Sequence, residues 1–344
     1  MRRPEFAPTL LLHVPLPIEL HIKEPASIFA FAPDDKLLLT VHGGEGGILW
    51  DLTLASSPRK LDFRRDESIS TQLITTAALL GEGRGFILGF GINHPARHYE
   101  IVDGSPGFRV SKQTLPAAND IAISQDGKTI VISTGTAVEV WDRTTVELRK
   151  VLSPDVDVIP PSLFEKVVIS DDSSYAAAVT ATGQLTVWGI EGDFYKVSPG
   201  QELGLDLGEG WQPASMGLNN IFAMAVLRRP APQPDWVLVN WGFAYQGPER
   251  TLYHQDFPPC ALACVPPSPD FVMMLTVQGH VMVKDTAMFA FFSTSKGASK
   301  KGKVVSCGVS GSGKMLAVAR SNGRLAVWRL HTREYGLGAQ LPDM

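Results

Sequence analysis

A short segment recurs along the chain: a glycine turn, then alternating β-branched or aliphatic residues, then tryptophan. The clearest copies span residues 183–188 and 323–328, and segments of similar shape end at Trp50, Trp141 and Lys284. Alternation with a period of two is typical of a β-strand that buries one face. A chain that repeats one strand motif is expected to fold into an array of similar sheets.

The spacing of these segments gives the length of the repeat. Trp50 and Trp141 are 91 residues apart, Trp141 and Trp188 are 47 apart, and Trp188 and Trp328 are 140 apart. These intervals are close to two, one and three units of about 45 residues, the length of a four-stranded propeller blade. A polar turn precedes the end of each segment by 14 to 16 residues, at Asp35, Asp126, Asp172, Asp270 and Ser312.

Two intervals without the tryptophan segment complete the count. Residues 75–109 and 220–255 contain apolar strand patterns, and in the second interval we expect the first strand at 221–227 and the second at 236–240. The sequence therefore predicts an all-β fold, a single seven-bladed β-propeller of four-stranded antiparallel blades over residues 1–344. The blades are expected to begin near Ser27, Thr75, Asp120, Lys166, Asn220, Ala261 and Val304.

An extra strand is predicted over residues 10–14, before the first repeat. A radial array of sheets must join its first and last blades. We expect this N-terminal strand to pair with the last blade, which closes the ring and leaves no exposed sheet edge.

Composition indicates a globular protein of the cytoplasm or nucleus. Hydrophobic residues make up 44% of the chain and charged residues 19%, which is enough apolar material for a large core. The net charge of −4 gives no global field that attracts nucleic acid or an anionic membrane. We expect no signal peptide, no membrane-spanning segment and, with three cysteines, no disulfide framework.

In its repeat length and strand-ending tryptophans the chain resembles the WD-repeat family, and the resemblance covers nearly all of it. The family's Trp-Asp dipeptide stands at residues 50–51 and 141–142, whereas Trp188 and Trp328 are followed by glycine and arginine. The Gly-His pair that opens each repeat of the family is absent, so the family's Asp-His-Ser-Trp hydrogen-bond network is not expected in every blade. The resemblance implies a rigid platform that binds proteins without catalysis.

Motifs for catalysis or cofactor binding fail in their context. Residues 308–314 match the glycine and lysine spacing of a phosphate-binding loop, but the next residues predict a strand where a helix is required. Cys260 and Cys264 are four residues apart on a predicted strand, about 13 Å at strand rise, too far for one zinc ion. His94 and His98 have no acidic or thiol partner at zinc spacing. We therefore predict no cofactor, no metal and no enzymatic activity.

The binding surface is predicted on one face of the disc, where the connections between blades and the turns from second to third strands open. A long lead-in to the fifth repeat contains Trp211, and residues 241–245, after the predicted second strand of that repeat, add further aromatic residues. Residues 296–303 form the most basic loop. The residues expected to contact a partner are Trp211, Trp241, Tyr245, His42, Arg97, His280, Lys300 and Lys301.

The predicted function is a non-catalytic scaffold: a propeller subunit, monomeric within a larger complex, that binds a protein or peptide at this face. Two alternatives stay open. Acidic side chains gathered from several blades would make the central channel the site of a metal-dependent hydrolase or lactonase, and the basic loop would suit a subunit of an RNA-processing or RNA-modifying complex. For the individual contacts, the alternatives are aromatic residues packed between blades and lysines that are merely solvated.

Overall fold

The computed structural model describes residues 4–15, 26–42, 46–53, 57–63, 69, 73–81, 84–104, 107–152, 163–170, 172–180, 185–190, 212–218, 222–229, 235–242, 248–253, 259–264, 272–276, 280–284, 289–293, 304–312, 314–320 and 324–334. For the strands within 4–15, 222–293 and 328–334, the structure describes the backbone alone. Among all these residues, no helix has the length and apolar character that crossing a membrane requires.

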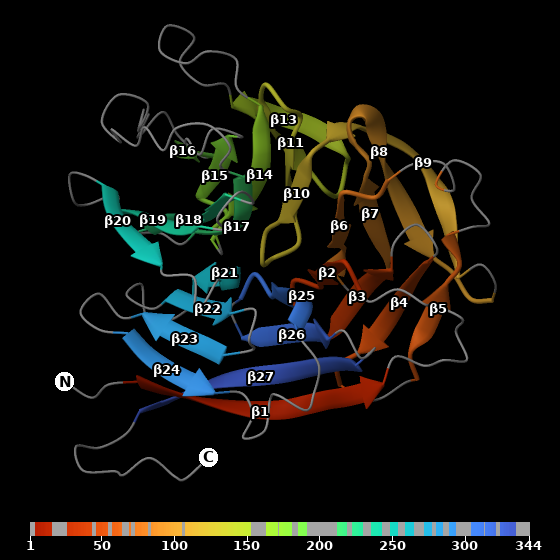
Figure 1. The fold of residues 1–344 in the computed structure, drawn as a ribbon. Helices are drawn as coiled ribbons and strands as arrows, with labels where there is room; N and C mark the ends of the chain where they lie inside the picture. Colours follow the sequence, from red (N-terminus) through yellow and green to blue (C-terminus); the bar gives the residue numbers. More distant parts are fainter. Residues whose placement is uncertain are drawn as a thin grey trace, which may run out of the picture.

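The described strands pair into seven antiparallel sheets (Figure 1). The first three sheets are β2 (Ile28–Phe31), β3 (Leu37–His42), β4 (Gly46–Asp51), β5 (Arg59–Leu61); β6 (Thr76–Leu79), β7 (Gly85–Gly89), β8 (Gly91–Ile101), β9 (Phe108–Ala118); and β10 (Asp120–Ile123), β11 (Thr129–Ser133), β12 (Val138–Asp142), β13 (Glu147–Leu152). The next two are β14 (Phe164–Ile169), β15 (Tyr175–Thr180), β16 (Leu185–Gly189); and β17 (Gln212–Leu218), β18 (Phe222–Arg229), β19 (Asp235–Gly242), β20 (Pro248–Tyr253). The last two are β21 (Pro259–Cys264), β22 (Val272–Thr276), β23 (His280–Lys284), β24 (Phe289–Ser293); and β25 (Val304–Val309), β26 (Met315–Arg320), β27 (Arg324–Glu334), β1 (Pro4–Pro15).

The sheets stand around a common centre, with the first strand of each sheet innermost (Figure 1). The inner strands touch one another in chain order and the last returns to the first: β2, β6, β10, β14, β17, β21, β25 and again β2. Sequential contacts of this kind define a β-propeller. The predicted all-β propeller of four-stranded antiparallel blades is confirmed.

The N-terminal strand closes the ring as predicted, although it is longer than expected. β1 pairs antiparallel with β27 along its whole length, with Pro4 opposite Glu334, Leu10 opposite Trp328 and Pro15 opposite Arg324. β27 thus has a partner on both sides, and a long sheet edge is covered.

The fifth sheet corrects the sequence prediction. Its first strand is β17, whereas the apolar run 221–227, which was expected to be first, belongs to the second strand β18. β17 has the sequence Gln-Pro-Ala-Ser-Met-Gly-Leu, and proline, serine and glycine do not signal a strand. Pro213 is tolerated because β17 is the end strand of its sheet, where one edge of the backbone needs no ladder bond.

The core consists of separate clusters between neighbouring sheets. Aromatic side chains dominate the cluster between the first and second sheets, where the rings of Phe86 and Tyr99 stack at 5.0 Å and Phe63 and Phe108 meet them edge-on or tilted. These aromatic residues fill the interface that a tryptophan fills elsewhere, which explains why the second repeat lacks the tryptophan segment.

The predicted polar turns join the first and second strands of the sheets. Ser124 Oγ donates to Asp126 Oδ1 (2.6 Å) and accepts from the backbone N–H of Thr129 (3.0 Å), and Ser170 repeats this pattern with Asp172 (2.8 Å). The residue after each aspartate has a positive φ, 68° at Gly127 and 64° at Ser173. Residues 308–314, which match a phosphate-loop spacing, lead into β26, so a strand follows them as predicted.

A variant of this turn ties the first sheet to the last. Asp35 has a positive φ of 57° and accepts a hydrogen bond from Ser312 Oγ across the junction of the ring. Its other oxygen, Oδ1, is buried with no hydrogen-bond partner among the described residues. Burial raises the pKa of Asp35 above the ordinary carboxyl value, against the opposing effect of the Ser312 hydrogen bond.

A second polar contact is fully buried within the first sheet. The indole Nε1–H of Trp50 donates to Thr40 Oγ1 (3.0 Å), and Thr40 Oγ1 also lies 3.0 Å from His42 Nε2. All three residues are buried. The threonine hydroxyl therefore satisfies the indole and imidazole groups at once.

Thr40→Val should destabilise the protein by about 1–3 kcal/mol, because it leaves the buried indole N–H without a partner while keeping the shape of the side chain. The free energy of unfolding in urea measures the effect. Thr136, exposed in a turn, offers the matched control, and Thr136→Val should change stability by less than about 0.5 kcal/mol. Equal effects of the two substitutions would contradict this account.

Asp35→Asn should stabilise the protein at pH 7, since asparagine keeps an oxygen for Ser312, tolerates a positive φ and carries no buried charge. The raised pKa means that the folded state binds the proton more tightly, so stability of the native chain falls as pH rises from the ordinary carboxyl range through that pKa. The gain from Asp35→Asn should therefore shrink toward pH 4, as thermal unfolding midpoints from pH 4 to 8 would show. Asp34→Asn, which removes an equal charge from an exposed neighbour, is the matched control for the loss of charge.

Candidate interaction face

The antiparallel strand order separates the connections of the propeller onto two faces. Each first strand starts at the face where the previous sheet ends, and each second strand returns to that face before turning into the third. We call this the loop-rich face. The turns from first to second and from third to fourth strands lie at the opposite face, so the two faces present different segments of every sheet.

Three exposed apolar side chains of the described residues lie at the loop-rich ends of the second and fourth sheets. Leu73 precedes β6 and is 76% exposed, Ile92 begins β8 and is 40% exposed, and Leu163 precedes β14 and is 38% exposed. We call these three side chains the apolar patch. Exposed apolar side chains grouped on one face are typical of interaction sites.

Backbone contacts hold the segments of the apolar patch together. Gly135, in the turn from β11 to β12, lies between two of them: a Cβ atom there would be 3.3 Å from Ile92 Cγ2 and 3.3 Å from Leu163 Cδ2. Its φ of +94° favours glycine at this position. Thr75 Oγ1 accepts from the backbone N–H of Gly91 (3.0 Å), which joins the segment of Leu73 to the turn of Ile92.

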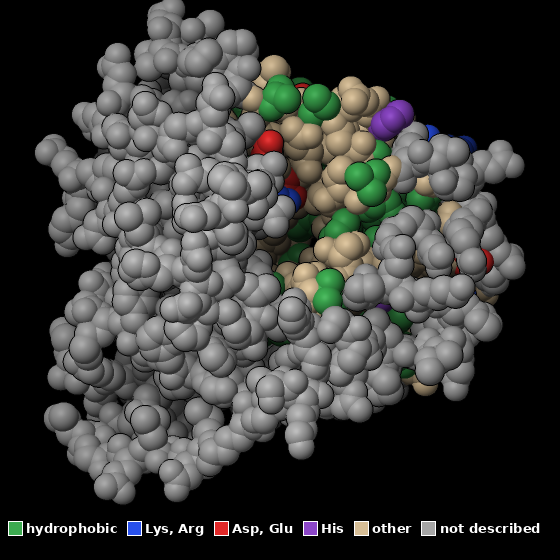
Figure 2. All heavy atoms as spheres, viewed as in Figure 1, with side chains coloured by type: hydrophobic (Ala, Val, Ile, Leu, Met, Phe, Trp, Pro, Cys, Tyr) green, Lys and Arg blue, Asp and Glu red, His purple; other side chains and the backbone are tan. Residues whose placement is uncertain are grey.

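The segment after Leu163 is bonded to the third sheet. The carbonyl oxygen of Phe164 accepts from Asn119 Nδ2 (2.8 Å) and from Ser133 Oγ (2.6 Å), and its N–H donates to the Gly135 carbonyl (2.6 Å). Leu163 is therefore presented from a fixed backbone, and little conformational entropy remains to be lost on binding. Figure 2 shows one side of the molecule, on which several hydrophobic side chains of the described residues reach the surface and charged ones are few.

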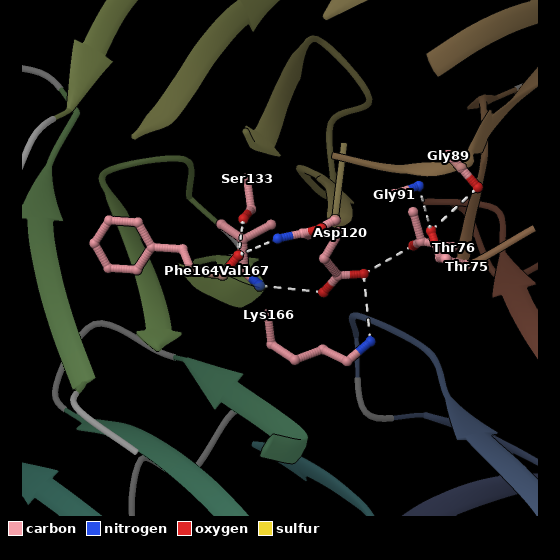
Figure 3. A network of polar contacts seen from close by, with 10 residues as sticks. Thr75, Thr76, Gly89, Gly91, Asp120, Ser133, Phe164, Lys166 and Val167 are labelled. Atoms are coloured by element: carbon pink, nitrogen blue, oxygen red, sulfur yellow. Dashed lines mark hydrogen bonds and ion pairs between the residues drawn. The ribbon is translucent and has the colours of Figure 1, made fainter. Parts of the chain in front are cut away.

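Asp120 connects three sheets beneath this face (Figure 3). Its Oδ1 accepts from Thr76 Oγ1 on β6 (2.8 Å) and lies 3.7 Å from Lys166 Nζ on β14, while Oδ2 accepts from the backbone N–H of Val167 (3.1 Å). The Asp120 side chain is 13% exposed and the Lys166 side chain 34%. A mostly buried carboxylate with three partners from two neighbouring sheets stabilises their relative position.

Glu165 is the acidic group nearest to the apolar patch along β14. The pairing of β14 with β15 shifts between Phe164 and Lys166, so Glu165 occupies a β-bulge, a feature that redirects a side chain. Partial burial raises the pKa of Glu165, and the charge of Lys166 opposes that rise. The face therefore combines apolar groups with a weakly acidic carboxyl group.

The predicted contact residues fare differently. His42 was expected on the surface, and this was wrong: it is 0% exposed, because its ring lies beside Thr40 Oγ1 in the core. Arg97 lies half-buried within β8. His280 begins β23, and its backbone alone is described. Trp211, Tyr245, Lys300 and Lys301 lie outside the described residues.

Trp241 lies at a different place in its sheet from the one predicted. It was expected after the second strand, but it belongs to β19, the third strand, where it pairs with Ala223 and Pro248. The error follows from the missed strand β17, which moves every later strand of the sheet by one position. Trp241 is the second-to-last residue of β19, and third strands end at the face opposite to the loop-rich one. A role for Trp241 in partner binding stays a prediction.

The central channel contains a cavity of about 230 Å³. Its described lining is dominated by aliphatic side chains of the inner strands, including Ala30, Leu79, Ile121, Val167 and Val309, with Gln125 and Ser312 among the few polar ones. Within the described residues no three His, Cys, Asp or Glu side chains come close enough to hold a metal ion. The basic loop 296–303 lies outside the described residues, so RNA binding stays a prediction.

Comparison with known proteins shows the fold. No protein-family model and no curated protein matches the chain. Solved structures do match: the Pan2 WD40 domain of Neurospora crassa superposes with a TM-score of 0.62 at 15% sequence identity, over 94% of this chain and 95% of that one. The chain therefore has the fold of a WD40 β-propeller domain.

Asp120→Ala should lower the free energy of unfolding by about 2–4 kcal/mol, because it removes contacts to two neighbouring sheets and leaves a partly buried lysine unpaired. Lys166→Met removes only the ion pair, because Asp120 keeps the hydrogen bonds from Thr76 and Val167. This substitution should lower the free energy of unfolding by about 1 kcal/mol or less. Urea unfolding of both variants measures the difference. A loss from Lys166→Met as large as that from Asp120→Ala would show that the ion pair, and not the hydrogen bonds, holds the sheets.

Proposed function

We propose that the chain is a non-catalytic interaction scaffold, a seven-bladed propeller subunit of a larger complex in the cytoplasm or nucleus. It binds a protein or peptide at the loop-rich face. The observation that carries the proposal is the apolar patch of Leu73, Ile92 and Leu163, exposed on segments that are bonded to the sheets behind them. The WD40 fold supports it by analogy from fold to function.

The blade number in this proposal rests on the inner strands. Seven first strands follow one another in contact within the described residues, and β25 returns to β2; this order supports seven blades. A closed ring keeps its loops in fixed relative positions, and rigid scaffolds with variable loops are where binding sites usually lie.

The energetics favour the apolar patch as an anchor. Full burial of a leucine or isoleucine side chain against a partner contributes about 1.5–3 kcal/mol, and pre-ordered loops reduce the entropic cost of binding. Trp211 comes before the first strand β17 in the chain, Lys300 and Lys301 come before the first strand β25, and His280 begins the third strand β23. We keep these residues as further contacts in the proposal because first and third strands begin at the loop-rich face.

The test is a pair of matched double substitutions. Leu73→Asp with Ile92→Asp should reduce recovery of the protein's partners at least about tenfold, because each aspartate would be desolvated against the partner's surface. Leu148→Asp with Val151→Asp changes two apolar residues of the outer strand β13, which are 46% and 49% exposed, and should leave recovery unchanged. Quantitative mass spectrometry after affinity purification at native expression gives the readout. Equal recovery with the two double variants would rule out the apolar patch as the binding site.

A further inference from the structure

A groove of about 940 Å³ lies between the second and third sheets, away from the loop-rich face. One wall is the hairpin of β8 and β9, and the turn after β12, with Arg143 and Thr144, forms the other. The turn from β6 to β7 closes its end. These are turns from first to second and from third to fourth strands, so the groove opens toward the opposite face of the ring.

The shape of the groove reflects an irregular pairing of β8 with β9. Arg97 pairs with Thr114 and Tyr99 pairs with Val110, so β9 has two more residues than β8 between these two pairs. A bulge of this kind bends and twists a strand. Its residues Ser111, Lys112 and Gln113 line the groove.

The groove is strongly basic although the whole chain is acidic. Its charged and titratable lining residues are Arg84, His98, Glu100, Arg109, Lys112 and Arg143. Glu100, the one carboxylate in the lining, accepts from Arg109 Nε (2.6 Å), and Asp126, outside the lining, interacts electrostatically with Arg143. The net charge of the chain is −4, which makes this concentration of positive charge a local feature.

Much of this positive charge faces solvent. The Arg109 side chain is 70% exposed even in its ion pair, and the exposed Lys112 makes no ion pair with a carboxylate of the described residues. Like charges held close together repel, and an anionic ligand removes that cost. The groove is therefore complementary to an anion.

The remaining lining narrows the choice of anion. Val110 is 48% exposed, and Ile101, Ser111 and Thr144 add apolar and neutral hydrogen-bonding groups between the cations. A phosphate backbone would meet Glu100 and the negative charge of the whole molecule. A peptide offers carboxylates for the cations, main-chain groups for Ser111 and Thr144, and apolar side chains for Val110.

We infer that this groove binds an acidic, extended peptide segment of a partner protein, at a site separate from the apolar patch of the loop-rich face. Specificity comes from carboxylates spaced to meet cations on both walls, with an apolar residue between them. Because the cations are exposed, binding is expected to weaken steeply as salt concentration rises.

The experiment measures fluorescence anisotropy of a labelled twelve-residue peptide of alternating glutamate and leucine with the full chain. Arg109→Glu with Lys112→Glu should weaken binding about tenfold or more at low salt, and the difference should narrow at high salt. Arg149→Glu with Lys36→Glu makes the same change of charge at exposed residues outside the groove and should weaken binding less than about twofold.

A second variant tests the site by a gain of binding, which misfolding cannot produce. Glu100→Gln keeps the shape of the side chain and removes the competing carboxylate, so affinity for the acidic peptide should rise about two- to fivefold. Three outcomes would overturn the inference. The first is an equal loss of peptide affinity in the two double variants, and the second is no gain of peptide affinity in Glu100→Gln. The third is a labelled single-stranded RNA that binds more tightly than the peptide and loses its affinity in the Arg109→Glu, Lys112→Glu variant.

Discussion

The pairing of β1 with β27 is the contact on which the rest of the structure depends. A propeller differs from an open row of sheets only in that its two ends are joined, and here the join is made by residues 4–15 against the last strand of the chain. Each inner strand then packs between two neighbours. Residues far apart in sequence, such as Asp35 and Ser312, become neighbours as a result.

Two aspartates show different ways in which adjacent sheets are held together. Asp120 engages both oxygens, with partners on β6 and β14, and this arrangement stabilises a carboxylate. Asp35 engages one oxygen and buries the other unpaired, at the junction of the first and last sheets. The polar groups at this junction are therefore less well satisfied than those by which Asp120 of the third sheet contacts the second and fourth sheets. The stability of this junction therefore depends more on β1 and on apolar packing. In that packing, Trp50 of the first sheet lies in one cluster with Met315 and Ala317 of the last sheet.

The repeat was predictable from sequence because its signals are local. Alternating strands, strand-ending tryptophans and serine-aspartate turns each depend on a few consecutive residues, and the structure contains them where expected. β17 was not predictable in the same way, since its sequence contains proline and glycine and its position follows from the geometry of the ring. Because β17 was missed, Trp241 was predicted to follow the second strand, whereas it lies on the third.

The prediction that His42 lies on the surface was wrong for a related reason. A histidine at the end of a strand is usually exposed, and only the register of β3 with β4, which brings Thr40 close to Trp50, shows that its ring completes a buried hydrogen-bond network. The third sheet has Ile132 where the first has Thr40, and there the indole of Trp141 donates to Glu139 Oε2 (2.8 Å). The indole N–H groups of equivalent tryptophans thus have different hydrogen-bond acceptors, and no single sequence motif identifies these acceptors.

The apolar patch and the basic groove both include residues of the second sheet but open on opposite faces. Apolar contacts keep their strength in salt, whereas contacts to exposed cations are screened, so the two surfaces suit partners of different chemistry. Coupling between them would need an element with two alternative arrangements. The contacts of Asp120 and Phe164 fix the second, third and fourth sheets to one another, so among the described residues a ligand at one end has no hinge through which to act on the other. The two proposed sites are therefore expected to bind independently, at a fixed separation from each other.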